Sequence, residues 1–161
     1  MNLIVSVDRN WGIGKNGDQL CYVPDDLKHF RQLTLGKTVI FSERTMQTFP
    51  NKRPLSGRRN IVVSKKDLQI NGAEVYHSVE EVLKNAPDNA FVMGGGKVYE
   101  SFLPYCDTAY VTKLRISFPA DTFLYNLDRS QDWKSIYVSP YYESGGIPFY
   151  FETYWRKNKI A

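Results

Sequence analysis

The stretch Phe91-Val92-Met93-Gly94-Gly95-Gly96-Lys97-Val98-Tyr99 joins an apolar run to three consecutive glycines and then to a segment of helical character that continues to Leu103. This order predicts a buried strand, a tight turn and a helix, as in α/β proteins. Glycine lets a ligand approach the main chain closely, and a helix N-terminus attracts anions, so the turn is a candidate site for a phosphate-bearing ligand. A tight turn without a ligand is the alternative, because the glycines do not follow the G-x-G-x-x-G pattern.

The length and composition are those of a globular chain with one core. The 161 residues are 42% hydrophobic and 24% charged, which predicts a single domain over residues 1–161. The formal net charge is +4, but the basic residues are dispersed, and neither a long basic run nor a nucleic-acid motif occurs. The charge therefore favours a small anionic ligand over a nucleic acid, with a basic surface of no functional meaning as the alternative.

Metal chemistry and covalent hydrolysis find no support in the sequence. Cys21 and Cys106 lack metal-ligand spacing, and the two histidines, His29 and His77, form no cluster with them. No serine lies in a nucleophile-elbow pattern. The first eight residues carry no basic segment, and their apolar run is too short for export or for a membrane span. We therefore expect a reduced, cytoplasmic protein with no metal site and no membrane segment.

Apolar and β-branched runs alternate with helical patterns early in the chain. Pro24 is expected to start a helix of about ten residues. Further helices are expected at 44–48, from Ser78 and at 97–103, with Ser78 and Glu81 as a capping box. Loops are expected at 8–19 and 50–57. Strands are expected at 3–7, 38–41, 60–63, 74–76, 90–93, 108–114, 134–141 and 149–155.

The order of these segments predicts the fold class. Helices between the early strands favour parallel pairing, and the last two strands, which flank residues 143–148, favour an antiparallel hairpin. The prediction is an α/β fold with a mostly parallel, eight-stranded central sheet, a C-terminal antiparallel hairpin and about four flanking helices.

A second chemical signal is the stretch Pro24-Asp25-Asp26-Leu27-Lys28-His29-Phe30. Asp25 and Asp26 lie at the expected helix start, where carboxylates favour the dipole. Asp26 precedes Leu27 and lies four residues before Phe30, so it flanks the apolar face of the helix. A carboxylate at the edge of an apolar pocket needs a partner, and it commonly binds a donor group or handles protons. Helix capping and a functional role both remain open for Asp26 on this pattern.

Six stretches in order resemble the dihydrofolate reductase family over nearly the whole length. They are Ile4-Val5-Ser6-Val7-Asp8, Gly12-Ile13-Gly14-Lys15-Asn16-Gly17, Pro24-Asp25-Asp26-Leu27-Lys28-His29-Phe30, Pro54-Leu55-Ser56-Gly57-Arg58-Arg59-Asn60-Ile61-Val62-Val63-Ser64, Gly94-Gly95-Gly96-Lys97-Val98-Tyr99, and Ala109-Tyr110-Val111-Thr112-Lys113 with Asp121-Thr122. The resemblance implies hydride transfer from NADPH to the C6–N5 bond of dihydrofolate, in a cytoplasmic protein that acts as a monomer.

The resemblance also implies substrate-site roles. Asp26 would hydrogen-bond the pterin and support protonation of N5, and Thr112 would hold Asp26. Arg58 would pair with the glutamate α-carboxylate of the substrate, for which a forked guanidinium is well suited. The other substrate-binding positions would be Ile4, Val5, Leu27, Phe30, Phe49, Met93 and Tyr99.

Cofactor-site roles follow from the same resemblance. Gly94 and Gly95 would be joined by the cis peptide bond of the family. Tyr99 would also meet the cofactor. The cofactor-binding positions would be Ser6, Ile13, Gly14, Gln19, Glu43, Arg44, Thr45, Ser64, Lys65, Gly95, Gly96, Lys97 and Val98.

Two stretches depart from the family pattern. Where the family reads Met-Gly-Arg-x-Thr, this chain reads Phe41-Ser42-Glu43-Arg44-Thr45, and the tryptophan of the active-site loop is replaced by Cys21. A carboxylate facing phosphate groups is repulsive, so the departure implies weaker NADPH binding or an altered cofactor preference. A diverged paralogue that reduces another pterin or a riboflavin-pathway pyrimidine is an alternative, against which Arg58 argues. A non-catalytic folate- or nucleotide-binding protein is the third hypothesis.

Overall fold

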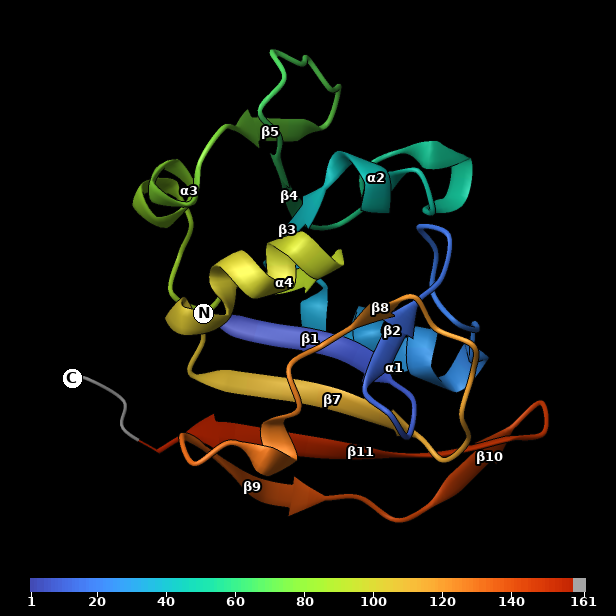
Figure 1. Ribbon diagram of the computed structural model, residues 1–161. Coiled ribbons are helices and arrows are strands. Elements are labelled where there is room, and N and C mark those ends of the chain that lie inside the picture. The colour runs from blue at the N-terminus through green and yellow to red at the C-terminus, as the bar shows by residue number, and fades with distance from the viewer. Residues whose placement is uncertain (158–161) are drawn as a thin grey trace.

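The computed structural model describes residues 1–157, which form a large mixed sheet flanked by helices (Figure 1). The four α-helices of this part of the chain are α1 (Pro24–Thr34), α2 (Glu43–Met46), α3 (Val79–Asn85) and α4 (Gly96–Phe102). The strands of the large sheet are β1 (Asn2–Val7), β3 (Thr38–Ser42), β4 (Arg59–Val63), β5 (Ala73–Tyr76), β6 (Phe91–Gly94), β7 (Thr108–Leu114), β9 (Trp133–Val138), β10 (Tyr142–Ser144) and β11 (Ile147–Arg156). Two short strands, β2 (Gly12–Gly14) and β8 (Thr122–Phe123), pair with each other. Single 3₁₀ turns lie at Pro50–Lys52, Leu103–Tyr105 and Leu127–Arg129.

Across the described residues the sheet is eight strands wide. Its order is β10-β11-β7-β1-β6-β3-β4-β5, and β9 pairs with β11 on the same side as β10. The pairs from β7 through β5 are parallel, whereas β11 is antiparallel to β7, β9 and β10. The predicted α/β fold, with its mostly parallel eight-stranded sheet, C-terminal antiparallel hairpin and four helices, is confirmed.

The predicted last pair of strands differs from the structure in its detail. The strand expected at 134–141 ends at Val138, because Ser139 turns its hydroxyl to accept the Phe151 N–H at 2.8 Å and Pro140 has no N–H to donate. The edge resumes as β10, so the turn of the hairpin shrinks to Gly145 and Gly146, with φ of 58° and 82°. Two consecutive residues of positive φ form the tight turn that matches the twist of a hairpin.

Local signals explain where the helices begin. Pro24 occupies the first turn of α1. The Ser78 hydroxyl caps α3 by accepting the Glu81 N–H at 3.1 Å. The predicted capping box is half right, because the Glu81 carboxylate accepts the N–H of His77, at 3.1 Å, instead of that of Ser78. Within residues 1–157 no helix is both long and apolar enough to cross a membrane.

Both faces of the sheet are covered, and β1 shows how. Leu3, Val5 and Val7 join a cluster that includes residues of α3 and α4, whereas Ile4 joins a second cluster against which Phe30 of α1 packs. Figure 1 accordingly shows α1 behind the sheet and α4 in front of it. A parallel strand buried on both sides requires apolar residues at consecutive positions, which is why β1 reads as a continuous apolar run.

Candidate active site

A cavity of about 1210 Å³ opens where β1 and β6 part. The two strands pair only at Asn2 with Phe91 and Leu3 with Val92, whereas the pairing of β1 with β7 continues to Val7. Residues 4–6 line one wall of the cavity, and residues 93–96 line another. The carboxyl ends of parallel strands are where open α/β sheets bind ligands, so the topology places the site at this edge.

Asp26 lines this cavity from the first turn of α1. Its Oδ1 accepts a hydrogen bond of 2.6 Å from Thr112 Oγ1 on β7, a residue 86 positions away in the sequence. Burial raises the pKa of Asp26 to about 6, and the hydrogen bond from Thr112 only partly opposes that rise. A carboxyl group with this pKa exchanges its proton close to neutral pH, as a general acid or base must.

Two other ionisable side chains near Asp26 stay neutral. The Tyr99 hydroxyl is buried and donates a hydrogen bond of 2.7 Å to the main-chain oxygen of Ile4. Burial, and then the charge of Asp26, raises the pKa of both Tyr99 and the Cys21 thiol. Tyr99 therefore holds the wall formed by β1, and Asp26 is left as the group of this trio that titrates near neutrality.

Arg58 lines the part of the cavity next to α1. Its Nε donates to the Ser56 oxygen at 3.0 Å, its Nη1 donates to Thr34 Oγ1 at 3.2 Å, and its Cζ lies 5.9 Å from the centre of the Phe30 ring. Burial, and then the neighbouring Arg31, lowers the pKa of Arg58. No acidic side chain pairs with Arg58 within residues 1–157. Its guanidinium is thus held in place with capacity left to bind a carboxylate.

The adjacent Arg59 behaves differently. Its Nε and Nη2 bind the two Glu74 carboxylate oxygens at 2.6 and 2.9 Å, and neither Arg59 nor Glu74 lines the cavity. Side chains alternate along a strand, so consecutive arginines face different partners. Arg59 therefore provides a matched internal comparison for Arg58.

The loop between β2 and α1 covers part of the cavity. It turns back at Asn16 and Gly17, which have φ of 53° and 81°, so that Lys15 and Asp18 exchange main-chain hydrogen bonds. The Asn16 N–H donates to Asp121 Oδ2 at 2.9 Å, which ties the loop to the segment before β8. The predicted loop at 8–19 therefore contains a tight turn at 15–18 and the short strand β2, which pairs with β8 and which the sequence pattern did not indicate.

Cations and hydroxyl groups gather around the glycine turn. Arg44, Thr45, Lys97 and Thr122 all line the cavity near it. A Cβ added at Gly95 would lie 3.3 Å from Thr45 Oγ1, and one added at Gly96 would lie 2.7 Å from Thr122 Cγ2. The peptide bond between Gly94 and Gly95 is cis, as the resemblance implies. Guanidinium, ammonium and hydroxyl donors form a set that suits phosphate groups.

The departures from the family pattern now have local explanations. The Ser42 hydroxyl accepts the Thr45 N–H at 3.2 Å and caps α2. Glu43 lies outside the cavity lining and pairs with Lys66 at 3.4 Å. Arg44, by contrast, lines the cavity and packs against Gly17 of the loop, where an added Cβ would lie 2.5 Å from its Nε.

The structure brings most of the predicted site residues together. The predicted positions that line the cavity are Ile4, Val5, Ser6, Ile13, Gly14, Gln19, Asp26, Leu27, Phe30, Arg44, Thr45, Phe49, Arg58, Met93, Gly95, Gly96, Lys97, Val98, Tyr99 and Thr112. Those that do not line it are Glu43, Ser64 and Lys65. The binding roles of all these residues remain predictions.

Other lining residues escaped the sequence analysis. Arg31 lies one helical turn after Leu27, so the periodicity of α1 would have identified it. Tyr22 lines the cavity and hydrogen-bonds Asp18 in the covering loop. Asp121 and Thr122 belong to a motif that was noticed but given no role. For Tyr22 and Thr122 no local signal exists, because only the folded loops bring them to the cavity.

The fold and the cavity define an α/β domain that binds a ligand at the carboxyl ends of its parallel strands. The family model described as "Dihydrofolate reductase" matches residues 1–156. Dihydrofolate reductase of Bacillus subtilis is 34% identical over 139 residues, which cover 84% of this chain and 81% of that protein. The enzyme of Staphylococcus haemolyticus is 32% identical over 163 positions, which cover 97% of this chain and 95% of that protein.

Among solved structures, dihydrofolate reductase from Enterococcus faecalis, complexed with NADP(H) and RAB-propyl, matches with a TM-score of 0.87 and 31% identity, covering 98% of this chain and 96% of that one. The chain belongs to the dihydrofolate reductase family.

Proposed function

We propose that this protein is a dihydrofolate reductase, which uses NADPH to reduce 7,8-dihydrofolate to 5,6,7,8-tetrahydrofolate. The observation that carries the proposal is the largely buried Asp26 carboxyl, hydrogen-bonded to Thr112, in a cavity that is also lined by the Arg58 guanidinium, which has no acidic partner within residues 1–157. This pair suits a substrate that needs a proton on a ring nitrogen and carries a carboxylate tail. Membership of the family supports the same reaction.

The roles we assign at the substrate follow from the side chains present. Asp26 binds the pterin amino group and supports proton delivery to N5, while Thr112 orients its carboxyl group. Arg58 binds the glutamate α-carboxylate of the substrate. The apolar walls that receive the pterin and benzoyl rings are assigned to Ile4, Val5, Leu27, Phe30, Phe49, Met93 and Tyr99.

NADPH fits the other part of the cavity, where the donor set suits phosphate groups. When bound, NADPH supplies the hydride that is added to C6 of the substrate. Arg44, Thr45 and Lys97 would hold the phosphates, and the covering loop from Ile13 to Gln19 would exclude water. Ser6, Gly14, Gly95, Gly96 and Val98 would contact the cofactor. Glu43, Ser64 and Lys65 are proposed to border its adenosine 2′-phosphate from outside the cavity lining.

The test is the oxidation of NADPH by the purified protein with dihydrofolate, followed by absorbance. We expect turnover that requires both compounds. Turnover of a reduced pterin without the glutamate tail, and not of dihydrofolate, would instead indicate the diverged paralogue. Binding of both compounds without turnover would indicate a non-catalytic folate- or nucleotide-binding protein.

Further properties are proposed on the same basis. We expect one domain that acts as a monomer in the cytoplasm, with small molecules and not nucleic acids or membranes as its partners. The proposed domain extends to Ala161, but residues 158–161 lie outside the described part of the chain. Sedimentation of the purified protein, with and without NADPH, tests the monomer.

A further inference from the structure

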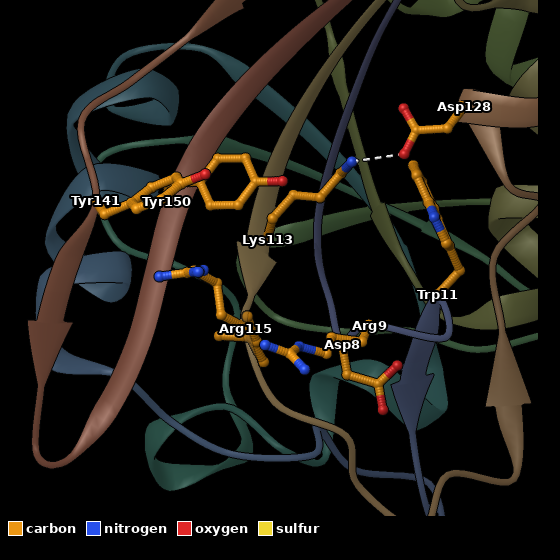
Figure 2. A pocket seen from close by; sticks show the side chains of 9 residues that line it. Asp8, Arg9, Trp11, Lys113, Arg115, Asp128, Tyr141 and Tyr150 are labelled. Carbon is orange, nitrogen blue, oxygen red and sulfur yellow. Dashed lines mark hydrogen bonds and ion pairs between the residues drawn. The ribbon is translucent and has the colours of Figure 1, made fainter.

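A second cavity, of about 250 Å³, is lined by Lys113 and Leu114 of β7, the strand that also carries Thr112, and Figure 2 shows the side chains that line this cavity. Side chains alternate along β7, so Lys113 and Arg115 face away from the side on which Thr112 meets Asp26. The turn after β1, the end of β7, the 3₁₀ turn at Leu127–Arg129 and the β10–β11 hairpin bound this cavity. The charged side chains that line it are Asp8, Arg9, Lys113, Arg115 and Asp128.

The Asp8 carboxylate of this cavity is already satisfied by the main chain. Its Oδ1 accepts the N–H groups of Asn10 and Gly12, both at 2.8 Å, and its Oδ2 accepts that of Phe118 at 2.9 Å. Asp8 is 2% exposed. A buried carboxylate with three donors has a structural task, which here is to hold the turn after β1.

Lys113 and Asp128 form an ion pair with each other. Lys113 Nζ lies 2.7 Å from Asp128 Oδ2 and 3.1 Å from Glu152 Oε1, and Asp128 Oδ1 also accepts a hydrogen bond of 2.6 Å from Tyr154. The Lys113 amine lies 5.0 Å from the centre of the Trp11 ring. Figure 2 shows this amine turned toward Asp128. Neither charge is therefore available to a ligand without breaking these ion pairs.

Two guanidinium groups remain. The Arg115 side chain contacts the ring of Tyr141, with its Cζ 4.1 Å from the ring centre, and Figure 2 shows it turned away from Asp128. Within residues 1–157 neither Arg9 nor Arg115 has a side-chain hydrogen bond or ion pair, and the Tyr150 hydroxyl has no hydrogen-bond partner either. The cavity is thus lined by hydrogen-bond donors that have no partner within residues 1–157, whereas both of its carboxylates are already hydrogen-bonded.

We propose that Arg9 and Arg115, together with the Tyr150 hydroxyl, bind a small oxyanion in this cavity. The ligand class is an inorganic or organic phosphate, or a dicarboxylate, because a planar guanidinium pairs with both. Both arginines line this cavity, and its volume of about 250 Å³ leaves room for one such ligand. The site lies at the base of the loop that covers the active-site cavity, since the turn held by Asp8 leads directly into β2. It does not depend on the proposed reductase activity.

The test is a titration of the isotope-labelled full chain followed by the main-chain amide signals in NMR spectra. Inorganic phosphate and succinate are the two probes, and potassium chloride at matched ionic strength is the control. We expect the amides of Arg9, Arg115 and Tyr141 to shift and to saturate in the millimolar range with at least one probe, but not with chloride. The probe that saturates identifies the kind of oxyanion, and saturation by both supports the shared chemistry.

Substitutions localise the effect. Arg115→Gln and Arg9→Gln each remove one guanidinium and are expected to raise the dissociation constant about fivefold or more. Arg53→Gln, at an exposed arginine that lines neither cavity, is the matched control and should change nothing. The unperturbed amide spectrum verifies that each variant is folded. Shifts that do not saturate, that chloride reproduces, or that persist unchanged in both variants would overturn the proposal.

Discussion

Asp26 shows how the surroundings of a single residue set its pKa and its hydrogen bonding. Its position before Leu27 and Phe30 left capping and function open, and the folded chain adds burial and the hydrogen bond from Thr112. The apolar surroundings disfavour the charged form of Asp26, and this is what brings its pKa to about 6.

Asp26→Asn removes the proton that the carboxyl group supplies while keeping its shape. We expect turnover at neutral pH to fall by about 10²–10⁴-fold, and part of the loss to be recovered at low pH, where solvent protonates the substrate. In the wild type, activity should fall as the pH rises above about 6, because Asp26 then loses its proton. Steady-state rates across the pH range check both expectations. A variant within about twofold of the wild type at neutral pH would remove Asp26 from the mechanism.

Arg58→Leu removes a guanidinium that lines the active-site cavity and has no acidic partner within residues 1–157. We expect the KM for dihydrofolate to rise about tenfold or more, since a charge-assisted contact to the substrate carboxylate is lost. Arg59→Leu is the control, because Arg59 is occupied by Glu74 and should affect KM little. Equal effects of the two substitutions would show that Arg58 has no special contact with the substrate.

The covering loop and α2 make contacts with other segments that the sequence patterns did not predict. Helices and strands with a clear period were predicted well, but β2 and β8 are too short to show a period, and only their mutual pairing makes them strands. The same holds for the contact between Gly17 and Arg44, residues that lie on separate segments. The predictions for this region therefore concern contacts between segments.

Gly17→Ala tests that contact. Alanine at φ of 81° is strained, and its Cβ would also displace the Arg44 guanidinium. We expect a loss of about 1 kcal/mol in unfolding free energy and a several-fold rise in the KM for NADPH. Gly36→Ala, at φ of 77° with no atom within 4 Å, should cost similar stability and leave KM unchanged. Denaturant unfolding and steady-state kinetics separate the two, and identical kinetics for both variants would contradict the role given to the contact.

We expect the start of α2 to contribute to the binding of the cofactor phosphates. Arg44→Gln should weaken NADPH binding about tenfold, because Arg44 lines the cavity. Glu43→Arg removes a negative charge next to Arg44 and frees Lys66, so NADPH should bind about tenfold tighter at low salt, with a smaller change for NADH. Fluorescence titrations with both cofactors at two salt concentrations measure these effects. If Glu43→Arg binds NADPH no better than the wild type, the Glu43 charge does not act on the phosphates.

The raised pKa of the Asp26 carboxyl group should also make the free energy of unfolding depend on pH. Because the folded state raises the pKa of Asp26 from 3.8 to about 6, it favours the protonated form, and its stability falls as the pH rises through that window. Asp26→Asn has no such charge, so at neutral pH it should be more stable than the wild type by about 3 kcal/mol, with little difference near pH 4. Urea unfolding of both proteins at several pH values measures this. A constant difference across the pH range would show that Asp26 does not titrate in the folded state as described.

Local sequence patterns predicted the helices and the longer strands, the parallel pairing of the early strands and the resemblance to the family, because apolar period, glycine turns and helix caps act over a few residues. They also placed Asp26, Arg58 and the glycine turn as candidates. Which of these candidates come into contact depends on how the whole chain folds. The bond between Thr112 and Asp26 spans 86 positions, and Glu43 lies outside the cavity that its neighbour Arg44 lines. Burial, pairing and pKa depend on neighbours that are distant in the sequence, and no local pattern contains them.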